Sequence, residues 1–199
     1  MPDRDTAGRS YQKASTRRAQ ILARAIELFA ERGVGASLRA IGEAIGVSHA
    51  ALRYYFASRD VLLVEVYREH ETASYDVRSE RSVVAAMAHS AQQNRDIPGL
   101  VELYATLTTD ALQPDRHPAA HAFIVERFRT MRADLADHIR NAQRDGIIDR
   151  DIDPVDAAAL VIAASDGLQV QWLLEPETVD VSRGLTLLQR LLPGATTSS

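Results

Sequence analysis

The chain contains no cysteine and a single lysine, Lys13, among its 199 residues. Without cysteine, disulfide bonds, thiolate nucleophiles and cysteine-ligated metal centres are excluded. No hydrophobic run appears long enough to cross a membrane, since the longest candidate, 157–164, falls well short of about 20 residues. The first ten residues lack an apolar signal core. We therefore expect a cytoplasmic protein.

Signatures of catalysis are missing as well. The sequence has no G-x-S-x-G, no phosphate-binding loop, no H-E-x-x-H and no G-x-G-x-x-G. His117 and His121 stand four residues apart, a spacing that can hold one metal on a helix. However, His117 precedes the expected helix, and no third ligand lies nearby. We expect no enzyme activity, no metal site and no cofactor.

Strand-like alternation is also lacking, and apolar residues instead recur at spacings of three and four. This pattern predicts an all-α fold of about nine helices. The charge is divided unevenly along the chain: residues 1–60 carry 10 Lys+Arg against 6 Asp+Glu, and residues 61–199 carry 13 against 21. A basic N-terminal part joined to an acidic C-terminal part is typical of a protein that binds phosphates through one end.

Two short helices around a tight turn are predicted over residues 37–59. Ser37 is a suitable N-cap for the first helix, and Gly46 can end it in the left-handed conformation. Ser48 can cap a second helix, whose Leu52 points inward. Such a pair is typical of a helix-turn-helix DNA-binding motif, although a plain helix hairpin in an all-α protein has the same spacing.

The outward face of the second helix has small residues at its start and aromatic residues near its end, which suits a helix in a DNA major groove. His49 is the leading candidate for a base contact, with a solvated surface position as the alternative. The hydroxyl groups of Tyr54 and Tyr55 can donate to phosphates, unless one of these rings packs mainly in the core.

A set of residues in 16–63 follows one order and spacing, namely Ile21, Ala25, Leu28, Phe29, Gly33, S-L-R-A-I-G-E-A-I-G-V-S (37–48), L-R-Y-Y-F (52–56) and A-S-R-D-V-L (57–62). In this respect the chain resembles the DNA-binding domain of TetR-family bacterial transcription regulators. It departs from the family pattern at Ala40, Gly42, Ile45, Ala50, Ala51 and Arg53. Positions 50, 51 and 53 lie on the reading helix, so these departures bear on the DNA sequence that is recognised.

The predicted DNA-binding residues combine this resemblance with the chemistry of the side chains. Arg39 can reach a phosphate or a guanine, and the residue matching Arg59 clamps the DNA backbone in the family. Arg17, in the first turn of its helix, is a candidate for a phosphate contact. The full set is Arg17, Ser37, Arg39, Ser48, His49, Ala50, Ala51, Arg53, Tyr54, Tyr55 and Arg59.

Three regions are predicted along the chain. Residues 1–14 are expected to form a flexible basic arm, 15–60 the helix-turn-helix DNA-binding domain, and 61–195 a helical ligand-sensing and dimerisation domain. The first helix should begin near Ser15. A fourth helix, from Ser58 to about Ser79, is expected to be the only covalent link between the two domains.

Two C-terminal helices are more apolar than one small bundle requires. The helix expected over 155–174 has Asp153 as its predicted N-cap and is apolar nearly all round. The next, over 179–192, is rich in leucine. We therefore predict a homodimer through these helices, the eighth and ninth, as the resemblance also implies. A twofold dimer would present two reading helices about 34–36 Å apart to adjacent major grooves.

The resemblance further implies a pocket for a small molecule in the helical body. Soft and aromatic side chains with a few polar groups are the candidates for its lining, and ordinary core packing is the alternative for each. Asp166 interrupts an apolar stretch, so it should pair with an arginine or a helix N-terminus, or meet a ligand. The candidates are Met87, Tyr104, His121, Phe123, Phe128, Met131, Asp166, Gln169 and Trp172.

The leading hypothesis is a ligand-responsive, sequence-specific repressor, released from a palindromic double-stranded DNA operator by a small hydrophobic or amphipathic effector. The alternative is a constitutive or architectural DNA-binding protein with a filled core and no effector. A helical enzyme or interaction module with an incidental N-terminal hairpin is the third and weakest hypothesis.

Overall fold

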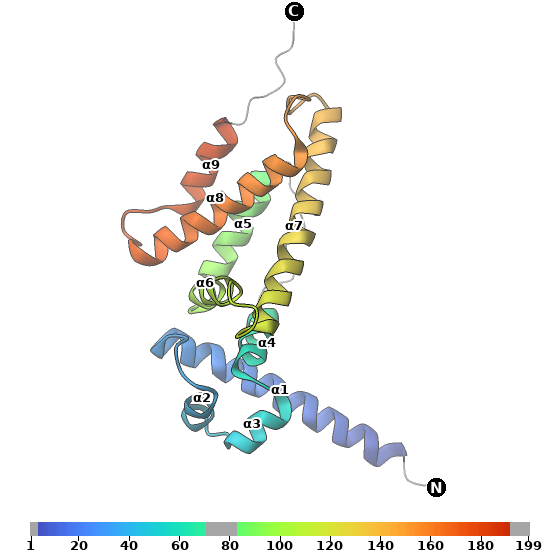
Figure 1. Ribbon diagram of the computed structural model, residues 1–199, viewed down its shortest axis with the longest axis vertical. Coiled ribbons are helices and arrows are strands. Elements are labelled where there is room, and N and C mark those ends of the chain that lie inside the picture. The colour runs from blue at the N-terminus through green and yellow to red at the C-terminus, as the bar shows by residue number, and fades with distance from the viewer. Residues whose placement is uncertain (1–3, 71–82, 192–199) are drawn as a thin grey trace, which may run out of the picture. The chain divides into compact units, whose positions relative to one another are not determined.

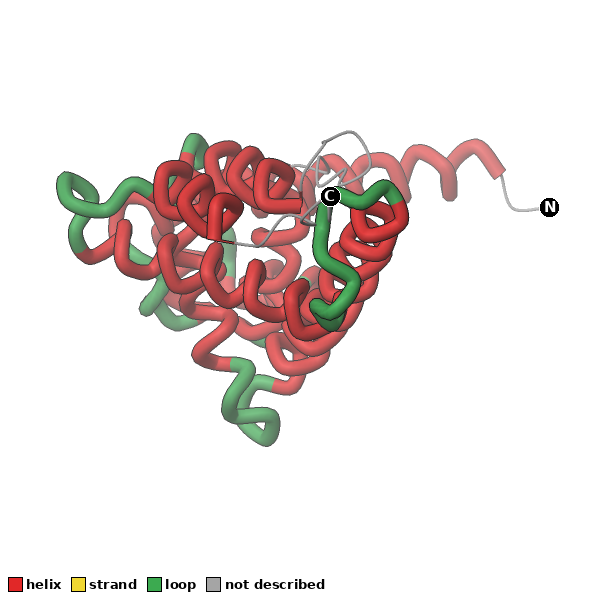
Figure 2. Tube along the Cα trace, turned by 90° about the horizontal axis from the view of Figure 1, so that it is seen from above, coloured by secondary structure: helices red, strands yellow, loops and turns green. Residues whose placement is uncertain are grey.

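The computed structural model describes residues 4–70 and 83–191, and within these ranges it contains nine α-helices and no β-strand (Figure 1). The tube view likewise shows only helices and loops in the described segments (Figure 2). The all-α prediction is confirmed. The described residues divide into two compact units: an N-terminal unit of 4–70 and 98–121, and a C-terminal unit of 83–97 and 122–191.

The N-terminal unit packs its helices around α1. It consists of α1 (Arg4–Arg32), α2 (Leu38–Ile45), α3 (His49–Tyr55), α4 (Arg59–His70), α6 (Leu100–Asp110) and the first turn of α7 (Pro118–Arg144). α1 contacts α2, α4 and α6, while α2 contacts α3 and α4 contacts α6. The α1 residues of the family pattern are buried in this core, together with apolar residues of the other helices: Ile21, Ala25, Leu28, Phe29, Ile41, Leu52, Phe56, Leu62, Tyr67, Leu103 and Leu107.

The start of α1 differs from the prediction. The helix begins at Arg4 and not near Ser15, so residues 4–14 continue the helix where a flexible arm was expected. Those residues have no apolar periodicity, which concealed the helix in the sequence. Extending an existing helix needs no such pattern, because each added residue gains one main-chain hydrogen bond. Residues 1–3 lie outside the described residues, as do residues 71–79 of the predicted fourth helix.

The boundary between the units also differs from the expected one at residue 61. α6 and the first turn of α7 belong to the N-terminal unit, so the chain passes between the units at 97–98 and again inside α7. Gly99, which precedes α6, has a φ of +80°, and a Cβ atom there would lie 2.8 Å from the backbone nitrogen of Ala30. α6 therefore approaches α1 closely at a point where only glycine fits.

The predicted helix caps are confirmed. The Oγ atoms of Ser37 and Ser48 accept hydrogen bonds from the third residue beyond, at 3.2 Å in both cases. Gly46 ends α2 with a φ of 71°. Asp153 caps α8 (Pro154–Leu174) through hydrogen bonds from the main-chain amides of residues 155 and 156.

The C-terminal unit is a helical bundle in which α5 (Val83–Arg95) packs against both α8 and α9 (Val181–Leu191), and α8 packs against α9. The rest of α7 completes the unit. Its core is formed by residues from all four helices: Val84, Met87, Ala91, Met131, Leu135, Ala136, Ile139, Ala157, Ala158, Val161, Ile162, Val181 and Leu185.

α8 is long enough and apolar enough to cross a membrane by length and composition alone, among the helices that the structure describes. The statement from sequence that no such segment exists was wrong, because it considered only the uninterrupted run at 157–164. One helix of this kind is weak support for a membrane span, since a core helix of a bundle passes the same test. The buried apolar residues of α8 pack in the core of the C-terminal unit.

Candidate nucleic-acid interface

The outward face of α3 carries the side chains that were predicted to read DNA. Leu52 and Phe56 are fully buried and hold the helix against the core. The residues on its other sides are exposed: His49, Ala50, Ala51, Arg53 and Tyr54. A short helix with one buried face and an opposite face of small, cationic and hydrogen-bonding residues has the form required to enter a major groove.

The two tyrosines of α3 have different environments. Tyr54 is 80% exposed, whereas Tyr55 is half-buried and its ring lies 6.4 Å from that of Phe56. The two tyrosine rings meet edge to face, with centroids 5.1 Å apart. Tyr54 is therefore the ring with a hydroxyl group free to face a partner, and Tyr55 braces it.

The start of α2 adds polar groups beside α3. Arg39 is exposed, and its Nε donates to Glu43 Oε1 at 2.9 Å. This hydrogen bond and the charge of the carboxylate raise the pKa of the Arg39 guanidinium above its usual value. Ser37 and Ser48 use their oxygen atoms as acceptors in the caps, so each hydroxyl hydrogen can still be donated to a phosphate.

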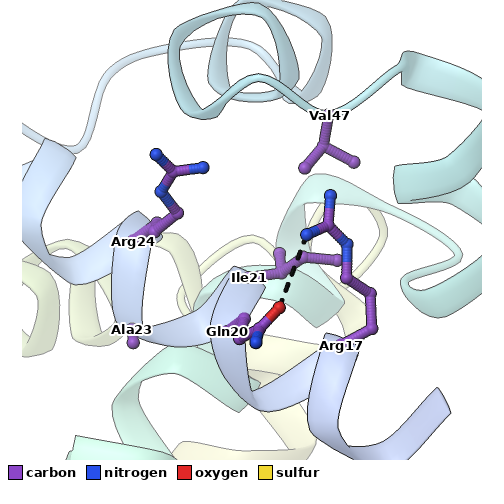
Figure 3. Close-up of a pocket in the computed structure, with 6 residues that line it drawn as sticks. All are labelled: Arg17, Gln20, Ile21, Ala23, Arg24 and Val47. Atoms are coloured by element: carbon purple, nitrogen blue, oxygen red, sulfur yellow. Dashed lines mark hydrogen bonds between the residues drawn. The ribbon is translucent and has the colours of Figure 1, made fainter. Parts of the chain in front are cut away.

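Arg17 lines a groove between α1 and the turn that joins α2 to α3 (Figure 3). The groove has a volume of about 290 Å³, and Val47 closes it on the side of the turn. Arg17 Nη1 lies 3.4 Å from Gln20 Oε1, and the side chain is exposed. Because α1 begins at Arg4, Arg17 does not lie in the first turn as predicted, and its phosphate contact stays a prediction that the exposed side chain allows.

Arg59 directs part of its guanidinium toward its own chain, and its side chain is 24% exposed. Its Nε donates to the carbonyl oxygen of Ala36 at 2.9 Å, and its Nη2 donates to that of Val34 at 2.6 Å. Its Nη1 lies 3.6 Å from Asp110 Oδ2 at the end of α6. The predicted role of Arg59 as a backbone clamp on DNA stays a prediction, because these contacts leave other N–H groups of the guanidinium available. The guanidinium ties the segment before α2 to α4 and α6.

Sequence reasoning did not single out Arg24, whose Nη1 donates to the carbonyl oxygen of Ile45 at 3.0 Å. Arg18, the neighbour of Arg17, pairs with Glu65, and its guanidinium carbon lies 5.5 Å from the centre of the Phe56 ring. The seven-residue spacing of Arg17 and Arg24 places both on one face of α1, and this was the available signal.

Asp60 links α4 to the start of α7. Its carboxylate is buried, and its two oxygen atoms accept hydrogen bonds from the amides of Ala119 at 2.7 Å and Ala120 at 3.1 Å. His117 lies between carboxylates, with Nδ1 4.0 Å from Asp60 and Nε2 3.8 Å from Asp110. The N-terminus of α7 is thus capped by a residue 59 positions earlier in the chain.

We expect Asp60→Asn to destabilise the N-terminal unit by about 2 kcal/mol, because an amide can accept with one oxygen only and a hydrogen bond to a charged group is lost. Asp153→Asn is the matched control. A single oxygen of Asp153 accepts both amides of its cap, so asparagine can replace it at a cost of a few tenths of a kcal/mol. Urea unfolding followed by circular dichroism measures the free energy of unfolding of both variants. Equal losses of stability would contradict the assignment of Asp60 as a cap that needs both carboxylate oxygens.

Sequence comparison agrees with this geometry. Residues 21–66 match the profile of bacterial regulatory proteins of the tetR family, and residues 81–196 match the C-terminal profile of BetI-type transcriptional repressors. The chain belongs to the TetR family of transcriptional regulators. TetR-family proteins are DNA-binding regulators, and this one is therefore a regulator and not an enzyme.

Individual relatives cover most of this TetR-family chain. The HTH-type transcriptional regulator PksA of Bacillus subtilis (strain 168) is 29% identical over 178 residues, covering 84% of this chain and 83% of PksA. A TetR-family regulator from Rhodococcus sp. is 26% identical, with a TM-score of 0.64 over 89% of this chain and 96% of its own. A regulator from Saccharomonospora viridis in complex with choline is 22% identical, with a TM-score of 0.69 over 89% of this chain and 95% of its own.

The nine predicted ligand residues of this TetR-family protein fall in both units. Tyr104 and His121 belong to the N-terminal unit. Tyr104 is buried and stacks on Tyr67 with ring centroids 5.3 Å apart, and His121 Nδ1 donates to the carbonyl oxygen of Ala111 at 2.9 Å. His117 and His121 therefore have separate partners.

The other seven belong to the C-terminal unit. Met87 and Met131 are part of its core, Phe123 is buried, and Phe128 packs against the core. Gln169 is buried and donates to the Ser165 oxygen atoms. Asp166 is half-buried and engaged in an interaction, and the ring of Trp172 lies 5.7 Å from the Arg95 guanidinium. A groove of about 610 Å³ between α8 and α9 is lined by none of the nine.

Proposed function

We propose that the protein is a ligand-responsive, sequence-specific repressor that acts in the cytoplasm and leaves a palindromic operator when a small hydrophobic or amphipathic effector binds. The observation that carries this proposal is the exposed face of α3, whose His49, Arg53 and Tyr54 stand clear of the core. Similarity to BetI-type repressors over 81–196 supports repression as the mode of action.

Each exposed group has a role that its chemistry suits. His49 and Arg53 can hydrogen-bond to base edges, while Ala50 and Ala51 allow the helix to approach the groove closely. Tyr54, Arg39 and Arg17 face phosphates, which hold the helix in register without reading sequence.

A homodimer through α8 and α9 would supply the twofold symmetry that a palindrome requires. Large apolar side chains on the outer face of α8 are exposed in the single chain, and small residues lie between them. The large residues are Val155, Leu160, Val170 and Leu174, and the small ones are Ala159, Ala163 and Gly167. Leu187 of α9 is 55% exposed as well. An apolar surface of this extent is typical of an oligomer interface.

The effector is proposed to bind among the seven candidate residues of the C-terminal unit, with Asp166, Gln169 and Trp172 as its polar and aromatic contacts. The choline complex of the Saccharomonospora viridis regulator, which shares the fold, makes choline the first compound to test. Aromatic rings bind quaternary ammonium groups through cation–π attraction. An effector would lower operator affinity through a coupling of about 1–3 kcal/mol.

The central experiment selects tightly bound duplexes from random DNA and then titrates the protein against the best of them, with and without choline. We expect one near-palindromic sequence to emerge, bound at least about 1,000-fold more tightly than a scrambled duplex. Recovery of no preferred sequence would contradict the proposed recognition. If no compound of a broad metabolite panel changes affinity, the effector part fails.

We expect Tyr54→Phe to weaken binding about tenfold on the selected and scrambled duplexes alike, because a hydrogen bond to a charged phosphate is lost without loss of base contacts. Tyr55→Phe is the control, since its ring is half-buried and its bracing contacts are made by carbon atoms. Fluorescence anisotropy at fixed salt measures both. A larger effect from Tyr55→Phe would reverse the roles assigned to the two rings.

A constitutive regulator with a filled core is the second candidate function. The packing of Met87 and Met131 in the core of the C-terminal unit favours it, because these side chains occupy space that a ligand would need. The choline and metabolite titrations separate the two candidates.

A further inference from the structure

Two arginines hold the opposite ends of α2. Arg24, from α1, donates to the carbonyl oxygen of Ile45, the last residue of α2. Arg59, from α4, donates to the carbonyl oxygens of Val34 and Ala36, in the segment that enters α2. α1 and α4 pack on each other, so both guanidinium groups extend from one scaffold.

α2 needs such support because it has only eight residues. A helix of this length is unstable in isolation, and its last carbonyl groups have no partner within the helix. A cation at the C-terminal end is also favoured by the helix dipole. Arg24 meets both needs at Ile45.

The pose of α2 determines the pose of α3. The turn between them is tight: Val47 N donates to the carbonyl oxygen of Gly42 at 2.8 Å, and Ser48 then caps α3. A Cβ atom on Gly42 would lie 2.7 Å from the carbonyl oxygen of Val47, so the turn lies directly on α2. A tilt of α2 is therefore transmitted to His49 and Arg53.

Arg59 also connects this arrangement to α6. Its Nη1 faces Asp110, the last residue of α6, and Asp110 faces His117 just before α7. All of these residues belong to the N-terminal unit. The guanidinium thus places the entry to α2 relative to α6 as well as to α4.

We propose that Arg24 and Arg59 are positioning residues for DNA recognition, which set the pose of the reading helix by holding both ends of α2 through main-chain carbonyl groups. The inference rests on the proposed sequence-specific binding and deepens it. It also replaces the phosphate contact predicted for Arg59 with an indirect role.

The test compares Arg59→Lys and Arg24→Gln with wild type on the selected duplex and on a scrambled duplex, over a range of salt concentrations. Lysine keeps the charge but cannot reproduce the two-carbonyl geometry of arginine, whereas it binds phosphate well. We expect each variant to lower the ratio of the two affinities about tenfold, with the salt dependence unchanged. Arg129→Gln, on an exposed arginine of the C-terminal unit, is the charge-matched control for Arg24→Gln.

Two results would overturn the proposal. The first is an Arg59→Lys variant that retains the wild-type affinity ratio, which would mean that Arg59 acts only as a surface charge. The second is an Arg24→Gln variant that binds both duplexes equally more weakly and reduces the slope of log affinity against log salt by about 0.9, which would mean that Arg24 contacts a phosphate. Hydrogen exchange on the free proteins gives a second readout. Faster exchange of α2 and α3 amides, with α6 amides unchanged, supports the proposal, and unchanged exchange in α2 and α3 opposes it.

The same design separates this proposal from the proposed function. A wild-type protein that selects no sequence refutes sequence-specific recognition, and hydrogen exchange then decides whether the arginines hold α2. If Arg59→Lys prevents folding, as shown by circular dichroism, Arg24→Gln decides by both readouts. If both variants fold and keep the wild-type preference for the selected duplex, the positioning role is refuted and sequence-specific recognition is not.

Discussion

Leu160→Glu is expected to convert the protein into a monomer and to reduce operator affinity by at least about 100-fold. Leu160 is 54% exposed on the outer face of α8, which we propose as the dimer interface. In a twofold dimer the substitution buries two carboxylates without partners, and an uncompensated buried charge costs about 3–5 kcal/mol. Each 1.4 kcal/mol corresponds to a tenfold change in a dissociation constant.

Light scattering after size exclusion measures the mass of the particle, and anisotropy titration on the selected duplex measures the affinity. Ile147→Glu is the matched control, because Ile147 is an apolar residue of the same unit, is 59% exposed, and lies in the loop after α7. We expect it to remain dimeric. A dimer that survives both Leu160→Glu and Val170→Glu would place the interface elsewhere.

The second large effect is expected at Gly99, where α6 approaches α1. Alanine in the left-handed conformation costs about 1–2 kcal/mol, and at this position its Cβ would also lie 2.8 Å from Ala30 N and 3.0 Å from Ala30 Cα. Because both atoms belong to the backbone of a helix, α6 has to move away. We expect Gly99→Ala to destabilise the N-terminal unit by about 3 kcal/mol in total.

Gly33→Ala isolates the conformational part of this loss. Gly33 has a φ of +75° in the same unit, and nothing lies within 4 Å of the position its Cβ would take. Its substitution should cost about 1–2 kcal/mol. Denaturant unfolding of the two variants, followed by circular dichroism, gives the difference. Equal losses would show that α6 does not need the close approach to α1.

The parts of the fold that follow from local chemistry were predicted from the sequence. Ser37, Ser48 and Asp153 cap helices where their hydroxyl or carboxylate groups precede apolar runs, and Gly46 ends α2. These features depend on residues within one turn of each other. The beginning of α1 was missed because Arg4 and its neighbours have no apolar stripe to mark them.

The partners of the arginines were predicted less well, since the partner of a long cationic side chain depends on which acceptors lie within its reach. Arg17 and Arg18 are neighbours in the sequence, yet Arg17 is exposed and Arg18 pairs with Glu65 of α4. Periodicity gives the face of a helix that a residue occupies. It does not give the carbonyl or carboxylate that the side chain will meet.

By itself, the sequence determined the helical class, the capped turn between α2 and α3, and the face of α3 that remains exposed, because all three depend on neighbouring residues. Only the tertiary structure decided that Arg59 turns inward to Val34 and Ala36, and that Asp60 caps a helix that begins at Pro118. These contacts join residues more than 20 positions apart. They exist because the packing of α1, α4 and α6 brings donors and acceptors together, and no local pattern records that packing.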